Sequence, residues 1–124
     1  MYLTLFLFLL IIKHAIADLF LQTYHKGIQK DRYFGNGHRH YAEHGVCTFI
    51  VSGCFLPLPL ALLAALIDYV LHWHIDSGKT LLVKKLGWKR NELRFWRLQT
   101  LDQILHFSTY MLIVFVFQAH VIVS

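Results

Sequence analysis

The sequence contains only two cysteines, Cys47 and Cys54, among its 124 residues. They lie seven residues apart in an apolar run, where a helix would separate them by roughly 10 Å along its axis. A disulfide cannot bridge that distance. We therefore exclude a disulfide between them and interpret both residues as small apolar packing groups.

Proline is equally scarce, and both prolines, Pro57 and Pro59, lie at one place. The hydrophobic content of 56% and the mean hydropathy of +0.48 exceed the values of ordinary soluble domains. The apolar stretch around the prolines is long enough for two membrane spans that meet at a turn. We expect an all-α, integral membrane four-helix bundle that forms one domain, with spans at about residues 2–22, 38–56, 60–79 and 98–123.

The N-terminus lacks the basic segment that precedes the apolar stretch of a signal peptide. Ala15, Ile16 and Ala17 resemble a cleavage site, but Lys13 and His14 interrupt the apolar stretch just before it. We therefore interpret this segment as the first span.

Acidic residues are few: seven, against twelve lysines and arginines, which gives a net charge of +5. Ten of the twelve basic residues lie in the first and third connections between spans or, for Arg39, at the edge of the first, so the charge does not indicate nucleic-acid binding. The positive-inside rule places both connections in the cytoplasm and both termini on the non-cytoplasmic side. We expect a multi-pass protein of the bacterial inner membrane whose partners are membrane lipids, and a homo-oligomer is compatible with this interpretation.

Each expected span carries two polar side chains four residues apart, which places both on one helix face. Spans one and three run toward the basic side and carry their pairs near their ends, whereas spans two and four carry theirs near their starts. All four pairs should therefore lie in one layer near the cytoplasmic interface. The pairs are His14 and Asp18, His40 and His44, His72 and Asp76, and Asp102 and His106.

An ionised aspartate in mid-membrane costs about 2.5–3.5 kcal/mol, so these side chains should face one another inside the bundle. Histidine and aspartate are ligands for divalent metals, with zinc as the first candidate and iron or manganese as the alternatives. Eight ligands exceed the need of one tetrahedral ion. Two ions, or one ion with supporting groups and a base, would use them, while a proton relay or a packing network is the alternative to a metal.

Several other polar residues lie near this layer. Asp68 lies one turn from His72, and Lys13 could neutralise its carboxylate. Glu43 is a candidate base. We interpret the remaining histidines as interfacial or terminal: His25, His38, His74 and His120.

Taken together, the motifs resemble a family of small bacterial and phage multi-span inner-membrane proteins of unknown function. The motifs are His14-x3-Asp18-x3-Gln22, His40-x3-His44, His72-x3-Asp76-x2-Lys79 and Asp102-Gln103-x2-His106. The resemblance covers nearly the whole chain and implies a short inner-membrane protein, but no activity. A looser similarity in site chemistry relates it to membrane-bound metal-dependent hydrolases.

Our leading hypothesis is a metal-dependent hydrolase that acts on a lipid or lipid-linked substrate from the cytoplasmic side. Asp76, Asp102 and Lys79 are the expected catalytic residues, with Gln22 and Gln103 orienting the ligands. A proton or divalent-metal transporter or channel is the alternative, although the distal halves of the spans are almost wholly apolar. A third alternative is a small phage-type membrane effector or assembly factor in which the polar layer only joins the helices.

Overall fold

The computed structural model describes residues 1–18, 34–35 and 37–122, and this part of the chain is built from helices. The predicted all-α four-helix bundle is confirmed. Its elements are α1 (Tyr2–Ile16), α3 (Gly37–Gly53), α4 (Leu58–Leu86), α5 (Leu93–Phe117) and the short 3-10 helix η3 (Gln118–His120).

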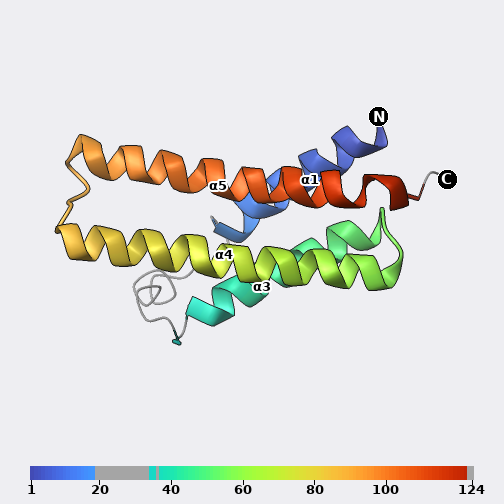
Figure 1. Ribbon diagram of the computed structural model, residues 1–124, viewed down its shortest axis with the longest axis horizontal. Coiled ribbons are helices and arrows are strands. Elements are labelled where there is room, and N and C mark those ends of the chain that lie inside the picture. The colour runs from blue at the N-terminus through green and yellow to red at the C-terminus, as the bar shows by residue number, and fades with distance from the viewer. Residues whose placement is uncertain (19–33, 36, 123–124) are drawn as a thin grey trace.

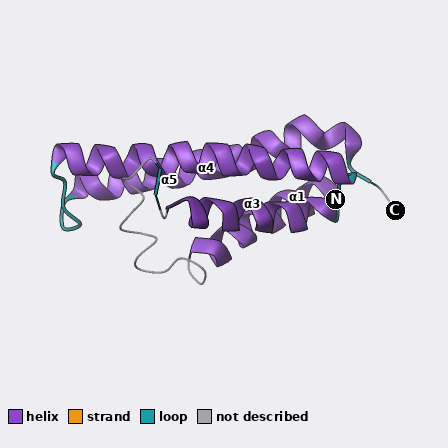
Figure 2. Cartoon of the chain, turned by 90° about the horizontal axis from the view of Figure 1, so that it is seen from below, coloured by secondary structure: helices purple, strands orange, loops and turns teal. Residues whose placement is uncertain are grey.

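The two long helices α4 and α5 run antiparallel along the length of the molecule (Figure 1). Helix α1 packs against α3 and α5, and α3 packs against α4, so the four helices close into a ring. Both shorter helices lie along the part of the long pair nearest the termini (Figure 2). The two termini and the α3–α4 turn share one end of the bundle, where the Ile122 amide donates a 2.8 Å hydrogen bond to the Phe55 carbonyl.

The expected proline turn joins α3 to α4. Helix α3 ends at Gly53, and Pro57 is the N-cap residue of α4, with Pro59 in its first turn. Proline suits this position because the first amides of a helix have no partner within it. Cys47 and Cys54 are both free, as expected.

The connection between α4 and α5 is much shorter than the basic connection that we predicted over residues 80–97. Helix α4 continues to Leu86 and α5 begins at Leu93, so helix extends into both ends of this connection. Lysine and leucine favour helix, and nothing stops α4 before Gly87. Gly87 has a φ of 63°, and its amide and that of Trp88 bond back to Lys84 and Val83, which ends the helix in a Schellman-type turn.

Two helices of the described chain, Leu58–Leu86 and Leu93–His120, are long and apolar enough to cross a membrane by length and composition. Helix α1 is apolar but shorter, at 15 residues, and α3 has 17. Residues 19–22 and 123, which we assigned to the first and fourth spans, lie outside the described part. Of the four expected spans, two therefore correspond to described helices long enough to cross a membrane.

Many polar residues lie in the interior of the bundle and many apolar residues lie on its surface. Buried positions include lysine, aspartate and histidine, whereas many large apolar side chains are exposed. The exposed apolar residues line the outer faces of three helices and include Phe8 and Ile12, Leu62 and Leu66, and Met111 and Phe115.

An apolar core fills the bundle at the end that holds the termini. Phe6 stacks on Phe55 with 4.8 Å between ring centroids, and small residues such as Ala61 and Ala64 let the helices approach. Ile113 and Phe117 complete this core from α5. The predicted polar layer begins about one turn beyond it, so one end of the bundle interior is apolar.

Candidate metal centre

All eight predicted ligands project into the bundle, and seven of them are buried. His14, His40, His44, His72 and His106 are each at most 2% exposed, while the Asp18 side chain is 29% exposed. Ala17 and Asp18 continue α1 in a wider π-helical turn, a feature common at functional sites. The four-residue spacing thus places both members of every pair on the inner face of their helix, as predicted.

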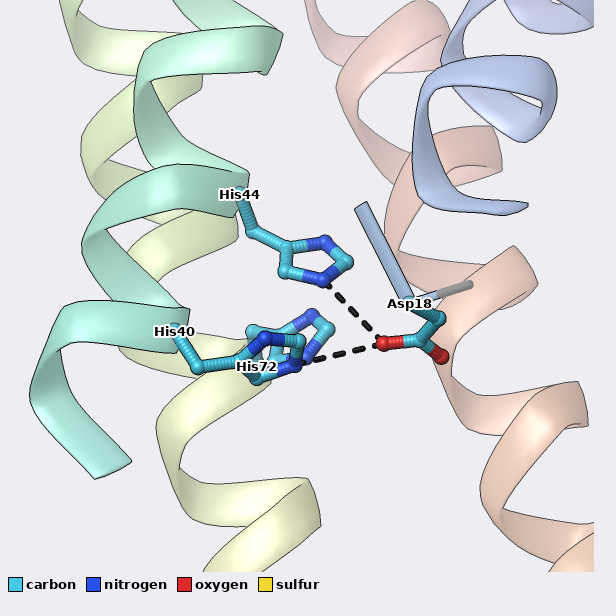
Figure 3. Close-up of side chains that lie close together, drawn as sticks. All are labelled: Asp18, His40, His44 and His72. Atoms are coloured by element: carbon cyan, nitrogen blue, oxygen red, sulfur yellow. Dashed lines mark hydrogen bonds and ion pairs between the residues drawn. The ribbon is translucent and has the colours of Figure 1, made fainter. Parts of the chain in front are cut away.

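The first group of ligands surrounds Asp18 (Figure 3). Its Oδ1 atom lies 3.2 Å from His40 Nε2 and 3.3 Å from His44 Nε2. His72 reaches the same place from α4, and its ring lies 3.8 Å from that of His44 between centroids. The possible ligand atoms of Asp18, His40, His44 and His72 all lie within 4.8 Å of one another.

The second group lies between α4 and α5 and consists of Asp76, Asp102 and His106. His106 Nε2 lies 3.4 Å from Asp76 Oδ1 and 3.7 Å from Asp102 Oδ1. All three residues are buried. A third set, His14, His72 and His106, connects the two groups, because it shares one histidine with each.

Lys79 and Gln103 hold the second group in place. Lys79 Nζ lies 2.8 Å from Asp102 Oδ2 and 3.9 Å from Asp76 Oδ1, and the Gln103 amide donates a 3.3 Å hydrogen bond to Asp102 Oδ2. The Lys79 side chain is 18% exposed, so it lies at the boundary between the buried layer and the surroundings. Gln22, the third supporting residue that we predicted, lies outside the described residues.

A buried ion pair lies one turn deeper in the bundle. Lys13 Nζ lies 2.5 Å from Asp68 Oδ2, as the sequence indicated, and also donates to the His44 carbonyl at 3.4 Å. The Thr48 hydroxyl donates a 2.5 Å hydrogen bond to the same aspartate oxygen. Because both charges are buried, each depends on the other for its stability.

Tyr110 is a site residue that the sequence analysis missed. Its hydroxyl shares a 2.8 Å hydrogen bond with His14 Nδ1, and Lys13 Nζ lies 4.6 Å from the centre of its ring. Tyr110 lies in the distal half of the fourth expected span, which the sequence analysis describes as almost wholly apolar. Its spacing could have identified it, because Tyr110 follows His106 by four residues, just as Thr48 follows His44.

The other candidates lie away from this layer. His74 is exposed and pairs with the carbonyl of its own helix, and His120 is also exposed, as expected for residues outside the site. His38 bonds the Tyr69 hydroxyl at 2.6 Å, and Glu43 is half-buried on α3. His25 lies outside the described residues.

The donor set suits a transition metal. Within the described chain, the Nε2 atoms of His14, His40 and His72 are buried and make no well-formed hydrogen bond, although each lies 3.2–3.4 Å from a carboxylate oxygen. Imidazole nitrogens that crowd around carboxylates without bonding them well are arranged as ligands are around an ion. These buried His/Asp groups could hold a metal ion.

Comparison with curated proteins gives no match, and comparison with solved structures gives none either. One family model, described as "Protein of unknown function (DUF3307)", matches residues 6–124. The match includes all eight candidate ligands and both supporting residues on α4 and α5. The chain therefore belongs to the DUF3307 family, whose function is unknown.

Proposed function

We propose that the protein is an intramembrane, metal-dependent hydrolase that acts on a lipid or lipid-linked substrate from the cytoplasmic side of a bacterial inner membrane. The observation that carries the proposal is the convergence of five histidines and three aspartates, from all four helices, in one largely buried layer. Zinc is the first candidate, because nitrogen and carboxylate ligands suit it.

The membrane part of the proposal is supported by the surface of the bundle. Exposed leucine, phenylalanine and methionine side chains cover the outer helix faces, whereas the charged residues Lys13, Asp68, Asp76 and Asp102 are buried inside the bundle. Soluble monomers rarely expose apolar patches of more than a few hundred Å². A lipid environment accounts both for the apolar surface and for the buried charged residues.

The proposed orientation of the bundle in the membrane rests on the basic residues at the end where α4 joins α5. Lysines and arginines gather there, and the opposite end, with the termini and the proline turn, has none between Pro57 and Pro59 or after Arg97. The positive-inside rule places the basic end in the cytoplasm. His72 follows Leu58 by 14 residues, or about 21 Å of helix, so a bilayer core of about 30 Å that begins at Leu58 would have the layer in its cytoplasmic third.

A divalent ion bound by these ligands would polarise the scissile carbonyl or phosphoryl group and make a bound water molecule acidic near neutral pH. In the hydrolysis, the water oxygen bonds to the acyl carbon or the phosphorus, and the bond from that atom to the leaving oxygen breaks. The proton leaves the water through Asp76 or Asp102 and ends on the leaving oxygen. Lys79, beside both carboxylates, neutralises negative charge that develops on the substrate.

The site has one closed side, which fits a substrate that enters from one leaflet. The apolar core of Phe6, Leu10, Ile113 and their neighbours lies beyond the polar layer toward the termini. Lys79 lies at the other edge and is partly exposed. A lipid headgroup at the cytoplasmic surface would therefore reach Lys79 first.

The proposal is tested with the full-length protein in vesicles of total bacterial lipid extract, with products followed by mass spectrometry. We expect loss of one lipid class and appearance of its hydrolysis product, abolished by a chelator and by Asp76→Ala. His74→Ala is the matched control, since this exposed histidine on the same helix should leave turnover unchanged. Turnover that survives both the chelator and Asp76→Ala would contradict the proposal.

One observation favours a transporter of protons or divalent metal as the second candidate. The pair of Lys13 and Asp68 extends the polar interior one turn toward the far side. The apolar core then closes the interior, which is why we rank transport second. Flux of protons or Zn²⁺ into protein-containing liposomes that disappears in Asp18→Asn would reverse this order.

A further inference from the structure

We propose that the layer holds two metal ions in unequal positions, a four-ligand position and a three-ligand position, with the Asp76 carboxylate between them. This inference rests on the proposed function only in using the same ligands. It concerns the number of ions and their distribution between the helices.

The four-ligand position is the group around Asp18. Its ligands come from three helices: Asp18 from α1, His40 and His44 from α3, and His72 from α4. Four protein ligands already satisfy a zinc-like ion, and the Asp76 oxygen described below would be a fifth, so no place is left for water. This ion would join α1, α3 and α4.

The three-ligand position is the group of Asp76, Asp102 and His106. Three protein ligands leave one coordination place open, as in catalytic zinc sites. Lys79, which contacts Asp102 and Asp76, borders this position and is partly exposed. The open place therefore faces the edge from which a substrate enters.

Asp76 links the two positions through its two oxygens. Its Oδ2 atom faces the first group, 3.4 Å from His72 Nε2 and 3.8 Å from His40 Nε2. Its Oδ1 atom faces the second, 3.4 Å from His106 Nε2. A carboxylate so placed can bridge two ions, the usual arrangement where metals lie about 3.5–4 Å apart.

A single ion cannot bind all eight candidate ligands. Two atoms bound to the same ion at 2.0–2.2 Å lie at most about 4.4 Å apart, close to the 4.8 Å limit within each group. The eight residues do not form one such group but a chain of three, and the two outer groups share no member.

The connecting set of His14, His72 and His106 is the single-ion alternative. It contains no carboxylate, and two of its three members, His72 and His106, already belong to the outer groups, so it adds only His14. His14 Nδ1 bonds Tyr110, and its Nε2 lies 3.3 Å from Asp18 Oδ2. We therefore assign to His14 the role of orienting the Asp18 carboxylate. The two outer groups then contain the other seven of the eight candidate residues.

The experiment measures bound metal in the full-length protein, purified in detergent, loaded with Zn²⁺ and freed of excess ion. The wild type should hold two ions per chain. The double variant Asp102→Ala with His106→Ala should hold one ion, and so should the double variant His40→Ala with His44→Ala. His74→Ala should keep both. One ion per chain in the wild type, removed by His14→Ala, would overturn the inference in favour of the connecting set.

A second measurement needs no variant and so does not depend on variants that fold. Loading the wild type with Mn²⁺ should give an electron paramagnetic resonance spectrum of two exchange-coupled ions. An uncoupled six-line spectrum at saturation would overturn the inference. If a protein with one ion still hydrolyses lipid, only the two-ion inference fails; if a protein with two ions hydrolyses none, the proposed function fails alone.

Discussion

At the scale of the residue, Tyr110 supports one of the eight candidate ligands through a single hydrogen bond. It bonds His14 Nδ1, which fixes the ring so that Nε2 faces Asp18. Groups that orient metal ligands in this way typically contribute 10- to 100-fold to affinity. Since His14 acts through Asp18, we place Tyr110 at the lower end of that range.

Tyr110→Phe should therefore weaken metal binding by about tenfold, with the bundle intact because only one oxygen is lost. Competition with a chromophoric chelator measures the change. Tyr69→Phe is the matched control, since it also removes a hydroxyl bonded to a histidine, His38, away from the eight ligands. Equal affinities for both variants and the wild type would refute a role for Tyr110.

The buried pair of Lys13 and Asp68 makes a prediction about stability. Lys13→Met leaves an unpaired carboxylate among buried residues and should lower the free energy of unfolding by about 3–5 kcal/mol. The double variant Lys13→Met with Asp68→Asn should recover much of this loss, because no buried charge remains unpaired. Unfolding in mixed micelles measures both, and a double variant less stable than either single one would contradict the explanation.

At the scale of the element, each helix carries an inner line of residues at four-residue intervals. On α3 this line is His40, His44, Thr48 and Ser52, all buried, so one line along the inner face of α3 is polar throughout. Because 4.0 residues nearly match the 3.6-residue turn, the line stays on one side for three turns. This repetition made the ligand pairs recognisable in the sequence.

Other features of the elements could not be predicted in the same way. The end of α4 depends on Gly87, and a basic, leucine-containing segment is equally compatible with helix and with connection until Gly87 is seen to adopt a positive φ. The contact between Lys13 and Asp68 could be anticipated from charge. The division of the ligands into groups could not, because it depends on how the helices are rotated against one another.

Helices α3 and α4 approach closely at Gly45, next to the ligand His44. A Cβ atom there would meet the Ala65 carbonyl oxygen and the Tyr69 Cβ at 3.4 Å, an ordinary contact distance. Gly45→Ala should therefore be tolerated. Gly45→Leu should force the helices apart, lower stability by about 1–3 kcal/mol and reduce metal retention.

Gly78→Leu is the control for this prediction, because a Cβ at Gly78 meets no atom within 4 Å. Thermal unfolding and bound metal are measured on all three variants. If Gly45→Leu and Gly78→Leu behave alike, close approach at Gly45 is not what positions His44.

At the scale of the whole molecule, an apolar exterior surrounds a polar layer that lies about halfway along α4, with His72 at the middle of this helix. The sequence predicted this arrangement because the direction of each helix converts four local pairs into one layer. Of the four expected spans, two correspond to described helices long enough to cross a membrane, and where each helix ends could not be predicted from composition alone.

The orientation of the bundle can be tested with a membrane-impermeant maleimide. Cys54, exposed beside the proline turn, should react only from the non-cytoplasmic side once Cys47 is replaced by serine. Lys89→Cys, in a chain with both native cysteines replaced by serine, should react only from the cytoplasmic side. Labelling of both positions from the same side would contradict a membrane-spanning bundle.

The central claim is that the polar layer is a metal centre, and metal content tests it most directly. Full-length protein purified from membranes without added metal and dialysed against metal-free buffer should retain at least one divalent ion per chain. Asp76→Ala combined with His72→Ala should lose it, while His74→Ala should not. Substoichiometric metal in the wild type, unchanged in the Asp76→Ala and His72→Ala variant, would contradict the account.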